Sequence, residues 1–367
     1  MSRWIVVALA LVGLGCGGDD AADPMMMMEP DEAAPSFVSY HALSEVEHIE
    51  PMPAGYALLG RRGLVAYDDD DQTQWELDPA GAPLTLGLAA DGSALRMAVA
   101  GEAEALGSVR VDRVDLDGAV AESFALVDPA GPLDQPTVVL REDGGAWIHG
   151  GQWPFFWQGR MFPDGTIEVV RPEAEERRAL LAAKDDEAYA LRSTWTTDVG
   201  VPELVELQRL DAEGTPLWSV TVHDGSHDAT GAFELGGTLG PDGQGGVLVM
   251  TRRSNQTDPE KTVIRRYDAE GRLVWTQAEP PTGLGSPRTL ARPGLGGGSV
   301  WIDESDGGNQ LVVRLVDPSG ETTAEGRFDG DHTPITDVTF IGDVLHVLTH
   351  DGLTRIYVPP QEIPPVM

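Results

Sequence analysis

Cysteine, lysine, aromatic residues and long apolar runs are all scarce in this sequence of 367 residues. The single cysteine, Cys16, excludes a disulfide within the chain, so a folded domain must depend on its apolar core. Lysine occurs only at Lys184 and Lys261, and 60 acidic residues against 25 Lys and Arg give a net charge of −35. That charge argues against nucleic acid as a partner and against direct contact with anionic lipid. The apolar run at residues 4–14 is shorter than the roughly 20 residues that a membrane-spanning helix needs.

The N-terminus has the order of a signal peptide: a basic residue, the apolar run 4–14, and small residues before Cys16. It resembles a bacterial lipoprotein signal, in which Gly15 and Cys16 match the last two positions. Gly13 and Leu14 depart from the usual leucine and small residue. The resemblance implies that residues 1–15 are removed and that Cys16 is acylated, and several acyl chains give stable membrane anchoring. A secretory signal with a chance cysteine and an uncleaved anchor helix are the other interpretations.

Residues 16–36, which follow the signal, are expected to be a disordered acidic tether, because branched and aromatic residues are few there. Residue 17 is not aspartate, so the same resemblance implies the outer membrane, on its periplasmic or surface face. Met25 to Met28 could bind Cu(I), but no His or Cys lies beside them. We predict no cofactor. At the other end, the Pro-rich tail 359–367 cannot continue a β ladder.

A repeated turn of Asp and Gly indicates the fold class. Residues 209–218 (Arg-Leu-Asp-Ala-Glu-Gly-Thr-Pro-Leu-Trp) align without gaps to residues 266–275 (Arg-Tyr-Asp-Ala-Glu-Gly-Arg-Leu-Val-Trp). Each copy predicts a turn between two apolar strands, with glycine available for a positive φ. Weaker copies occur at residues 77–81, 115–118, 163–165 and 316–320.

A second pattern, a turn followed by a short apolar strand, alternates with the first. Its seven copies begin at Gly55, Asp91, Gly144, Glu187, Gly245, Gly298 and Gly342. Their spacing averages near the roughly 40 to 50 residues of a propeller blade, and each unit would hold four short antiparallel strands. We therefore predict an all-β chain with a single β-propeller over residues 37–358. Seven four-stranded blades fit best; six or eight blades, or a pair of β-sandwiches, are the alternatives.

The repeat also decides a local conflict between helix and strand. Residues 172–184 have good helix propensity. In register, however, residues 179–182 fall where the apolar segments 138–140 and 289–291 fall in other units. We predict a strand from about Arg178, preceded by at most one helical turn.

The units resemble PQQ-like (quinoprotein-type) β-propeller repeats, in which a strand ends in Asp, turns on Gly and is followed by Trp. Only the units at 209–218 and 266–275 carry all three residues. The resemblance does not extend to the quinone cofactor, because quinoprotein dehydrogenases add an adjacent cysteine pair and a calcium site, and this chain has no second cysteine. The chain is closer in character to cofactor-free propeller lipoproteins that act as outer-membrane scaffolds.

One loop gathers residue types that bind metals. His223, Asp224, His227 and Asp228 place two imidazoles and two carboxylates within six residues, which suits Zn or Ni. A hydrated loop on the propeller rim is the other interpretation.

Two acidic runs, residues 68–71 and 303–306, are dense enough in oxygen for Ca²⁺. We expect the first to be a hairpin tip between Tyr67 and Trp75, where the charges simply stay hydrated.

Aromatic residues are densest at 152–157. On a strand, Trp153, Phe155 and Trp157 would share one face, and His149 lies close in sequence. Such a group could stack on a sugar or peptide, or could pack between two blades as core.

No motif predicts a reaction. The sequence has neither a nucleophile-elbow motif nor a phosphate-binding glycine loop, although a dispersed Ser-His-Asp triad stays open. Our first hypothesis is a lipid-anchored, non-enzymatic scaffold of the bacterial envelope, attached to the membrane by lipid and binding a protein or polymer. The alternative is a periplasmic hydrolase acting on a sugar or lactone in the central channel.

Overall fold

The computed structural model describes residues 34–359 apart from gaps at 44, 79–80, 90, 101–107, 128–136, 142, 153–154, 165, 171–175, 183–186, 195–203, 226–232, 255–260, 280–287, 292–297, 306–308, 331–333 and 350–351. The chain divides into two units, Met1–Asp31 and Glu32–Met367, and every described strand belongs to the second. Cys16 and most of the expected tether lie outside the described residues. Within the described part, no helix has the length and apolar character needed to cross a bilayer.

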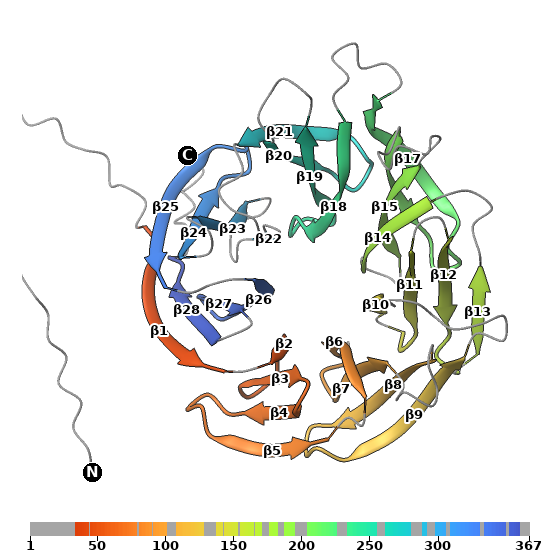
Figure 1. Cartoon of the computed structure of the whole chain (residues 1–367), viewed down its shortest axis with the longest axis vertical. Helices are drawn as coiled ribbons and strands as arrows, with labels where there is room; N and C mark the ends of the chain where they lie inside the picture. Colours follow the sequence, from red (N-terminus) through yellow and green to blue (C-terminus); the bar gives the residue numbers. More distant parts are fainter. Residues whose placement is uncertain are drawn as a thin grey trace, which may run out of the picture. The chain divides into compact units, whose positions relative to one another are not determined.

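Seven four-stranded antiparallel sheets follow one another around a ring, which makes this unit a seven-bladed β-propeller (Figure 1). The prediction of fold class and blade number is confirmed. Blade 1 contains β2 (Val46–Pro51), β3 (Tyr56–Gly60), β4 (Gly63–Tyr67) and β5 (Thr73–Leu77). Blade 2 contains β6 (Ala82–Leu88), β7 (Ala94–Ala100), β8 (Ser108–Asp115) and β9 (Val120–Val127). Blade 3 contains β10 (Thr137–Leu140), β11 (Ala146–Gln152), β12 (Phe155–Met161) and β13 (Ile167–Val170).

The remaining blades keep the same order from the inner to the outer strand. Blade 4 contains β14 (Glu176–Ala182), β15 (Ala188–Thr194), β16 (Leu204–Leu210) and β17 (Pro216–Asp224). Blade 5 contains β18 (Phe233–Pro241), β19 (Val247–Ser254), β20 (Lys261–Tyr267) and β21 (Leu273–Glu279). Blade 6 contains β22 (Arg288–Ala291), β23 (Ser299–Ser305), β24 (Gln310–Val316) and β25 (Thr322–Asp329).

Blade 7 is built from both ends of the propeller sequence. Its inner strands are β26 (Ile335–Ile341), β27 (Val344–Thr349) and β28 (Gly352–Tyr357), and its outer strand is β1 (Ser36–Ala42). The register runs antiparallel from Ser36 opposite Tyr357 to Ala42 opposite Gly352. The ring is therefore closed by hydrogen bonds between the first and last strands of the chain.

The core lies between the blades, because each short sheet has two apolar faces to bury. Between blades 1 and 2, for example, Ala57 and Leu59 of β3 pack with Leu95, Met97 and Val99 of β7, and all five are fully buried. The seven copies of the turn-and-strand pattern correspond to the second strands, β3, β7, β11, β15, β19, β23 and β27. The predicted strand near Arg178 is also present, since β14 begins at Glu176.

One copy of the Asp and Gly pattern was misplaced by sequence reasoning. Residues 77–81 lie where β5 ends and β6 begins, so they join two blades instead of turning within one. The matching turn of blade 1 is at residues 68–72, where Asp68 Oδ1 accepts the backbone N–H groups of Asp70 and Gln72. This turn carries Asp71 at φ 60° where the other turns carry glycine. The glycine pattern therefore could not mark it.

Candidate functional site

The repeated Asp, Gly and Trp residues meet at the junctions between blades. At the junction of blades 4 and 5, the Asp268 carboxylate accepts two backbone N–H groups of its turn. Gly271 in that turn has φ 80°, and a Cβ there would lie 3.0 Å from the ring of Trp218, on β17 of blade 4. The indole Nε1 of Trp218 donates to the Ala269 carbonyl at 3.0 Å. The motif thus docks a tryptophan of one blade onto the turn of the next.

At two more junctions a tryptophan ring packs against the glycine of the next turn, and one of these also has the indole hydrogen bond. Between blades 1 and 2, a Cβ on Gly118 would lie 2.8 Å from the ring of Trp75, whose Nε1 donates to the Leu116 carbonyl at 2.7 Å. Between blades 5 and 6, a Cβ on Gly320 would lie 2.8 Å from the ring of Trp275. Glycine is required at these turns both for the positive φ and for the close approach of the indole.

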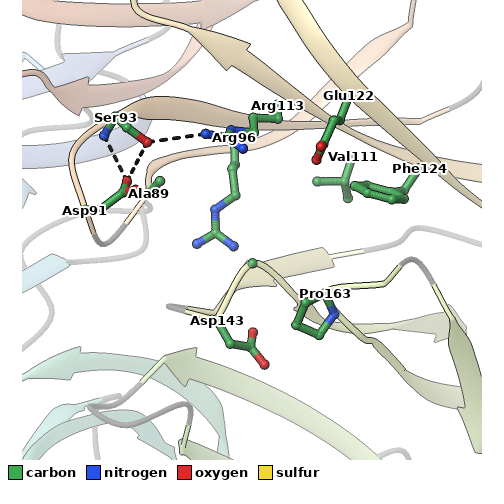
Figure 2. A pocket seen from close by; sticks show the side chains of 11 residues that line it. Ala89, Asp91, Ser93, Arg96, Val111, Arg113, Glu122, Phe124, Asp143 and Pro163 are labelled. Carbon is green, nitrogen blue, oxygen red and sulfur yellow. Dashed lines mark hydrogen bonds between the residues drawn. The ribbon is translucent and has the colours of Figure 1, made fainter.

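The junction of blades 2 and 3 departs from this pattern. In the strand register, Arg113 of β8 lies opposite Glu122 of β9, just as Arg209 of β16 lies opposite Trp218 of β17. Glu122 therefore occupies the position of the docking tryptophan. A pocket of about 340 Å³ opens at this junction, bounded by β7 to β9 and the turn before β7 in blade 2, and by two turns of blade 3 (Figure 2).

The pocket has an apolar side and a charged side. Val111, Phe124 and Pro163 supply the apolar surface, and Pro163 belongs to the turn that corresponds to the tryptophan-accepting turns of other blades. The charged side chains are Asp91, Arg96, Arg113, Glu122 and Asp143.

The polar groups of the pocket are held by their neighbours (Figure 2). Arg96 is only 7% exposed, and its Nη1 donates to the Gly145 carbonyl at 3.3 Å. Arg113 Nη2 donates to Ser93 Oγ at 3.4 Å, and Ser93 Oγ donates to Asp91 Oδ1 at 2.6 Å. The hydrogen bonds from Ser93 lower the pKa of the Asp91 carboxyl. The pocket therefore presents fixed charges of both signs beside an apolar wall.

A second set of charged residues lies on the inner strands. Glu50 Oε1 on β2 accepts the backbone N–H of Leu88 in blade 2 at 3.1 Å. Asp337 Oδ2 on β26 accepts the backbone N–H of Ile49 in blade 1 at 3.0 Å. Burial, reinforced by the charge of Asp337, raises the pKa of Glu50 to about 7. Each carboxylate joins the inner strand of its own blade to the next.

The same role is played between blades 6 and 7. Glu304 Oε1 accepts the backbone N–H of Ile335 at 2.8 Å, and Arg288 Nη2 donates to the carbonyls of Ile335 and Thr336. Burial raises the pKa of Glu304 and lowers the pKa of Arg288. Arg288 on the inner strand β22 and Glu304 on the second strand β23 thus join blade 6 to β26 of blade 7, with which neither strand forms a ladder.

A third cluster lies where blade 7 meets blade 1. Both oxygens of Asp71 accept hydrogen bonds from Arg355 on β28, and Tyr56 Oη donates to Asp71 Oδ1 at 2.9 Å. The Arg355 guanidinium, with help from Tyr56, lowers the pKa of Asp71 to about 2. The expectation that residues 68–71 only carry hydrated charge is wrong for Asp71. Because the partner lies 284 positions away, the local sequence gave no sign of it.

The predicted metal loop is only partly within the described residues. His223 and Asp224 end β17, whereas His227 and Asp228 lie outside the described part. His223 is buried, with Nδ1 4.0 Å from Oε1 of Glu234, a fully buried carboxylate that Arg265 pairs. Across the described residues, no group of three His, Cys, Asp or Glu side chains is placed to hold a metal ion. The metal site stays a prediction.

The predicted aromatic platform is defined only in its backbone. His149 lies on β11, Phe155 and Trp157 lie on β12, and Trp153 falls outside the described residues. The register pairs His149 with Gln158 and Trp157 with Gly150, so these residues lie on adjacent strands of blade 3. The stacking site stays a prediction too.

The pocket between blades 2 and 3 was missed by sequence reasoning. A signal for it exists, namely the acidic Glu122 at a register position where three other blades carry tryptophan. The sequence could have supplied it, because the copy at residues 115–118, extended without gaps like residues 209–218, places Glu122 where Trp218 and Trp275 stand.

No protein-family model matches the chain, and no curated protein matches it in sequence. Solved structures share its fold. BamB from Moraxella catarrhalis is 13% identical with a TM-score of 0.53, covering 90% of this chain and 100% of that one. A hydrazine synthase chain from Kuenenia stuttgartiensis is 13% identical with a TM-score of 0.59, covering 87% and 97%. A catalytically inactive virginiamycin B lyase from Staphylococcus aureus is 13% identical with a TM-score of 0.53, covering 88% and 99%. The similarity is one of propeller fold.

Proposed function

We propose that this chain is a lipid-anchored β-propeller of the bacterial envelope that binds a protein or polymer partner as a scaffold. The anchor would be acylated Cys16, and the location would be the outer membrane. The N-terminal sequence pattern supports both. The net charge of −35 favours partners with basic surfaces and disfavours nucleic acid.

One observation carries the scaffold interpretation. The charged side chains of the inner strands bind backbone groups of the next blade, as Glu50 binds Leu88 N–H and Asp337 binds Ile49 N–H. A carboxyl group held in this way joins adjacent blades and is less available for proton transfer to a substrate. The inner strands are therefore better suited to a rigid frame than to a catalytic centre.

The test is capture of a partner from labelled envelope with the wild-type chain and with Cys16→Ala. We expect the wild type to fractionate with membranes, to incorporate labelled fatty acid and to recover a defined partner after crosslinking. Cys16→Ala should lose both the label and the membrane association. A wild-type product with an unmodified Cys16 contradicts the anchor, and recovery of no partner contradicts the scaffold.

A second candidate is a hydrolase acting on a sugar or lactone in the channel. It is favoured by one observation, the pKa of Glu50 near 7 beside the charge of Asp337, since a carboxyl poised near neutrality can act as an acid or base. Turnover of a panel of lactones and glycosides that Glu50→Gln abolishes would support this candidate over the scaffold.

A further inference from the structure

We propose that the pocket between blades 2 and 3 binds an aromatic side chain of a protein partner. This side chain would occupy the position that tryptophan fills at three other blade junctions. The inference rests on the scaffold function, because it names the chemical group that the scaffold recognises.

The first support is the register. Glu122 lies opposite Arg113, as Trp218 lies opposite Arg209. The wall opposite Glu122 includes Pro163, which holds the turn position of Ala269 in blade 5. Since the Ala269 carbonyl accepts the indole N–H of Trp218, the corresponding carbonyl of Pro163 is placed to accept an indole N–H from a ligand. The junction of blades 2 and 3 thus keeps the turn that accepts a tryptophan elsewhere, but has no tryptophan in front of it.

The second support is the size and lining of the pocket. About 340 Å³ lies at the small end of the roughly 300 to 1,000 Å³ typical of ligand sites. Val111 is buried, and Phe124 packs against the core cluster of that junction, so both give a firm apolar wall. A flat ring that fits such a slot gains stability by removing this apolar surface from water.

The third support comes from the arginines. At the next junction, Trp147 of β11 lies under two guanidinium groups, with Arg141 Cζ 5.2 Å and Arg160 Cζ 6.0 Å from the ring centre. Arg113 holds in blade 2 the register position of Arg160 in blade 3, since each lies opposite a glutamate on the fourth strand. An aromatic ring in the pocket can therefore stack on Arg113 in the same manner.

The surroundings also indicate what flanks the ring. Asp91 and Glu122 are the acidic groups of the pocket that face a ligand, since Asp143, which also lines it, is paired with Arg141 at 2.8 Å. Strand β9 is the outer strand of its sheet, so its outer edge can pair with an extended peptide. We expect an extended partner segment with an aromatic residue beside an arginine or lysine.

The proposal is tested by titrating the full mature chain into N-acetyl-5-fluoro-L-tryptophanamide and measuring binding of this probe by ¹⁹F NMR. Glu122→Trp should fill the slot and weaken probe binding at least about tenfold, which corresponds to about 1.4 kcal/mol. The matched control is Glu168→Trp, because Glu168 of β13 holds the equivalent register position opposite Arg160 at a junction that Trp147 already fills. It should bind the probe as the wild type does.

No binding by the wild type, or equal binding by wild type and Glu122→Trp, would overturn the proposal. Should Glu122→Trp fail to fold, a diazirine derivative of the probe tests the wild type directly. Labelling of β9 or of the turn at residues 162–166 supports the site, and labelling confined to other blades rejects it.

Envelope capture separates this proposal from the scaffold function. Loss of the wild-type partner from Glu122→Trp, with retention by Glu168→Trp, supports the pocket as the docking point. Equal capture by all three chains rejects the pocket and leaves the scaffold intact. Absence of a partner for the wild type rejects the scaffold, while the probe titration still decides whether the slot accepts a ring.

Discussion

Individual charged residues in this propeller are used as ties between strands, and Glu50 illustrates the cost of doing so. Its carboxyl is buried, and burial raises its pKa to about 7 although it accepts a hydrogen bond from Leu88. In the unfolded chain the ordinary value is about 4.5. A carboxyl with a raised pKa in the folded state favours folding below the unfolded value, and that contribution is lost as the pH rises through 7.

Replacement of Glu50 by glutamine should therefore remove a pH dependence of stability. The amide oxygen can still accept the Leu88 N–H but cannot ionise. Between about pH 5 and about pH 8.5, we expect the unfolding free energy of Glu50→Gln to gain about 2 to 3 kcal/mol relative to wild type. Urea denaturation at both pH values measures this.

The control for that experiment is Glu47→Gln on the same strand, where the side chain is 34% exposed and pairs with Arg61. It should show little change in relative stability with pH. A parallel pH response of the two variants would contradict the burial of Glu50 as the cause.

The elements of the fold are short hairpins, and three of the blade junctions are joined by the contact between a tryptophan and the next turn. This helps to explain why the repeat was visible in the sequence: Gly118, Gly271 and Gly320 combine a positive φ with an indole packed against the turn. The contact also requires the turn to keep one conformation, so turn and tryptophan depend on each other.

Gly271→Ala tests that dependence. The new Cβ would meet the Trp218 ring at 3.0 Å in a backbone with φ 80°. Gly245→Ala in the same blade is the matched control, because it has φ 86° with nothing within 4 Å. We expect Gly245→Ala to lower the free energy of unfolding by about 1 kcal/mol, because of its positive φ alone. Gly271→Ala should lower it by about 3 kcal/mol, because the clash with the indole is added. Equal losses in chemical denaturation would show that the indole contact contributes nothing.

Many of the strands and turns could be predicted from the sequence. All seven second strands were located because each follows a turn with an unambiguous Gly or acidic signal, as at Gly298 before β23. The misplaced copy at residues 77–81 failed because Asp71 replaces glycine in the true turn. The candidate pocket was also missed. The copy at residues 115–118, extended without gaps, already places Glu122 where two other copies carry tryptophan, but the pocket that results is visible only in the structure.

At the scale of the whole molecule, ring closure depends on residues from both ends of the propeller. Strand β1 completes blade 7 beside β28, and Arg355 reaches across to Asp71 and Tyr56 of blade 1. Neither set of contacts is local in sequence. The sequence patterns therefore predicted the propeller but not the strand pairing and side-chain contacts that close the ring.

Removal of β1 should destabilise the whole ring. A chain beginning at Leu43 leaves the edge of β28 unpaired, and we expect a lower melting temperature together with self-association through that edge. A synthetic peptide of residues 34–43 added in trans should restore the monomer and raise the melting temperature, measured by light scattering and calorimetry. A scrambled peptide is the control. A truncated chain that stays monomeric and melts like the full chain would contradict closure through β1.

The pairing of β1 with β28 also sets an order of events in biosynthesis. A chain that leaves the cytoplasm N-terminus first delivers β1 long before its partner, with more than six blades still to emerge. Until the last strand has crossed, β1, which contains the exposed Phe37 and Tyr40, has no partner strand. Under the proposed export to the envelope, periplasmic chaperones would meet this protein first at β1.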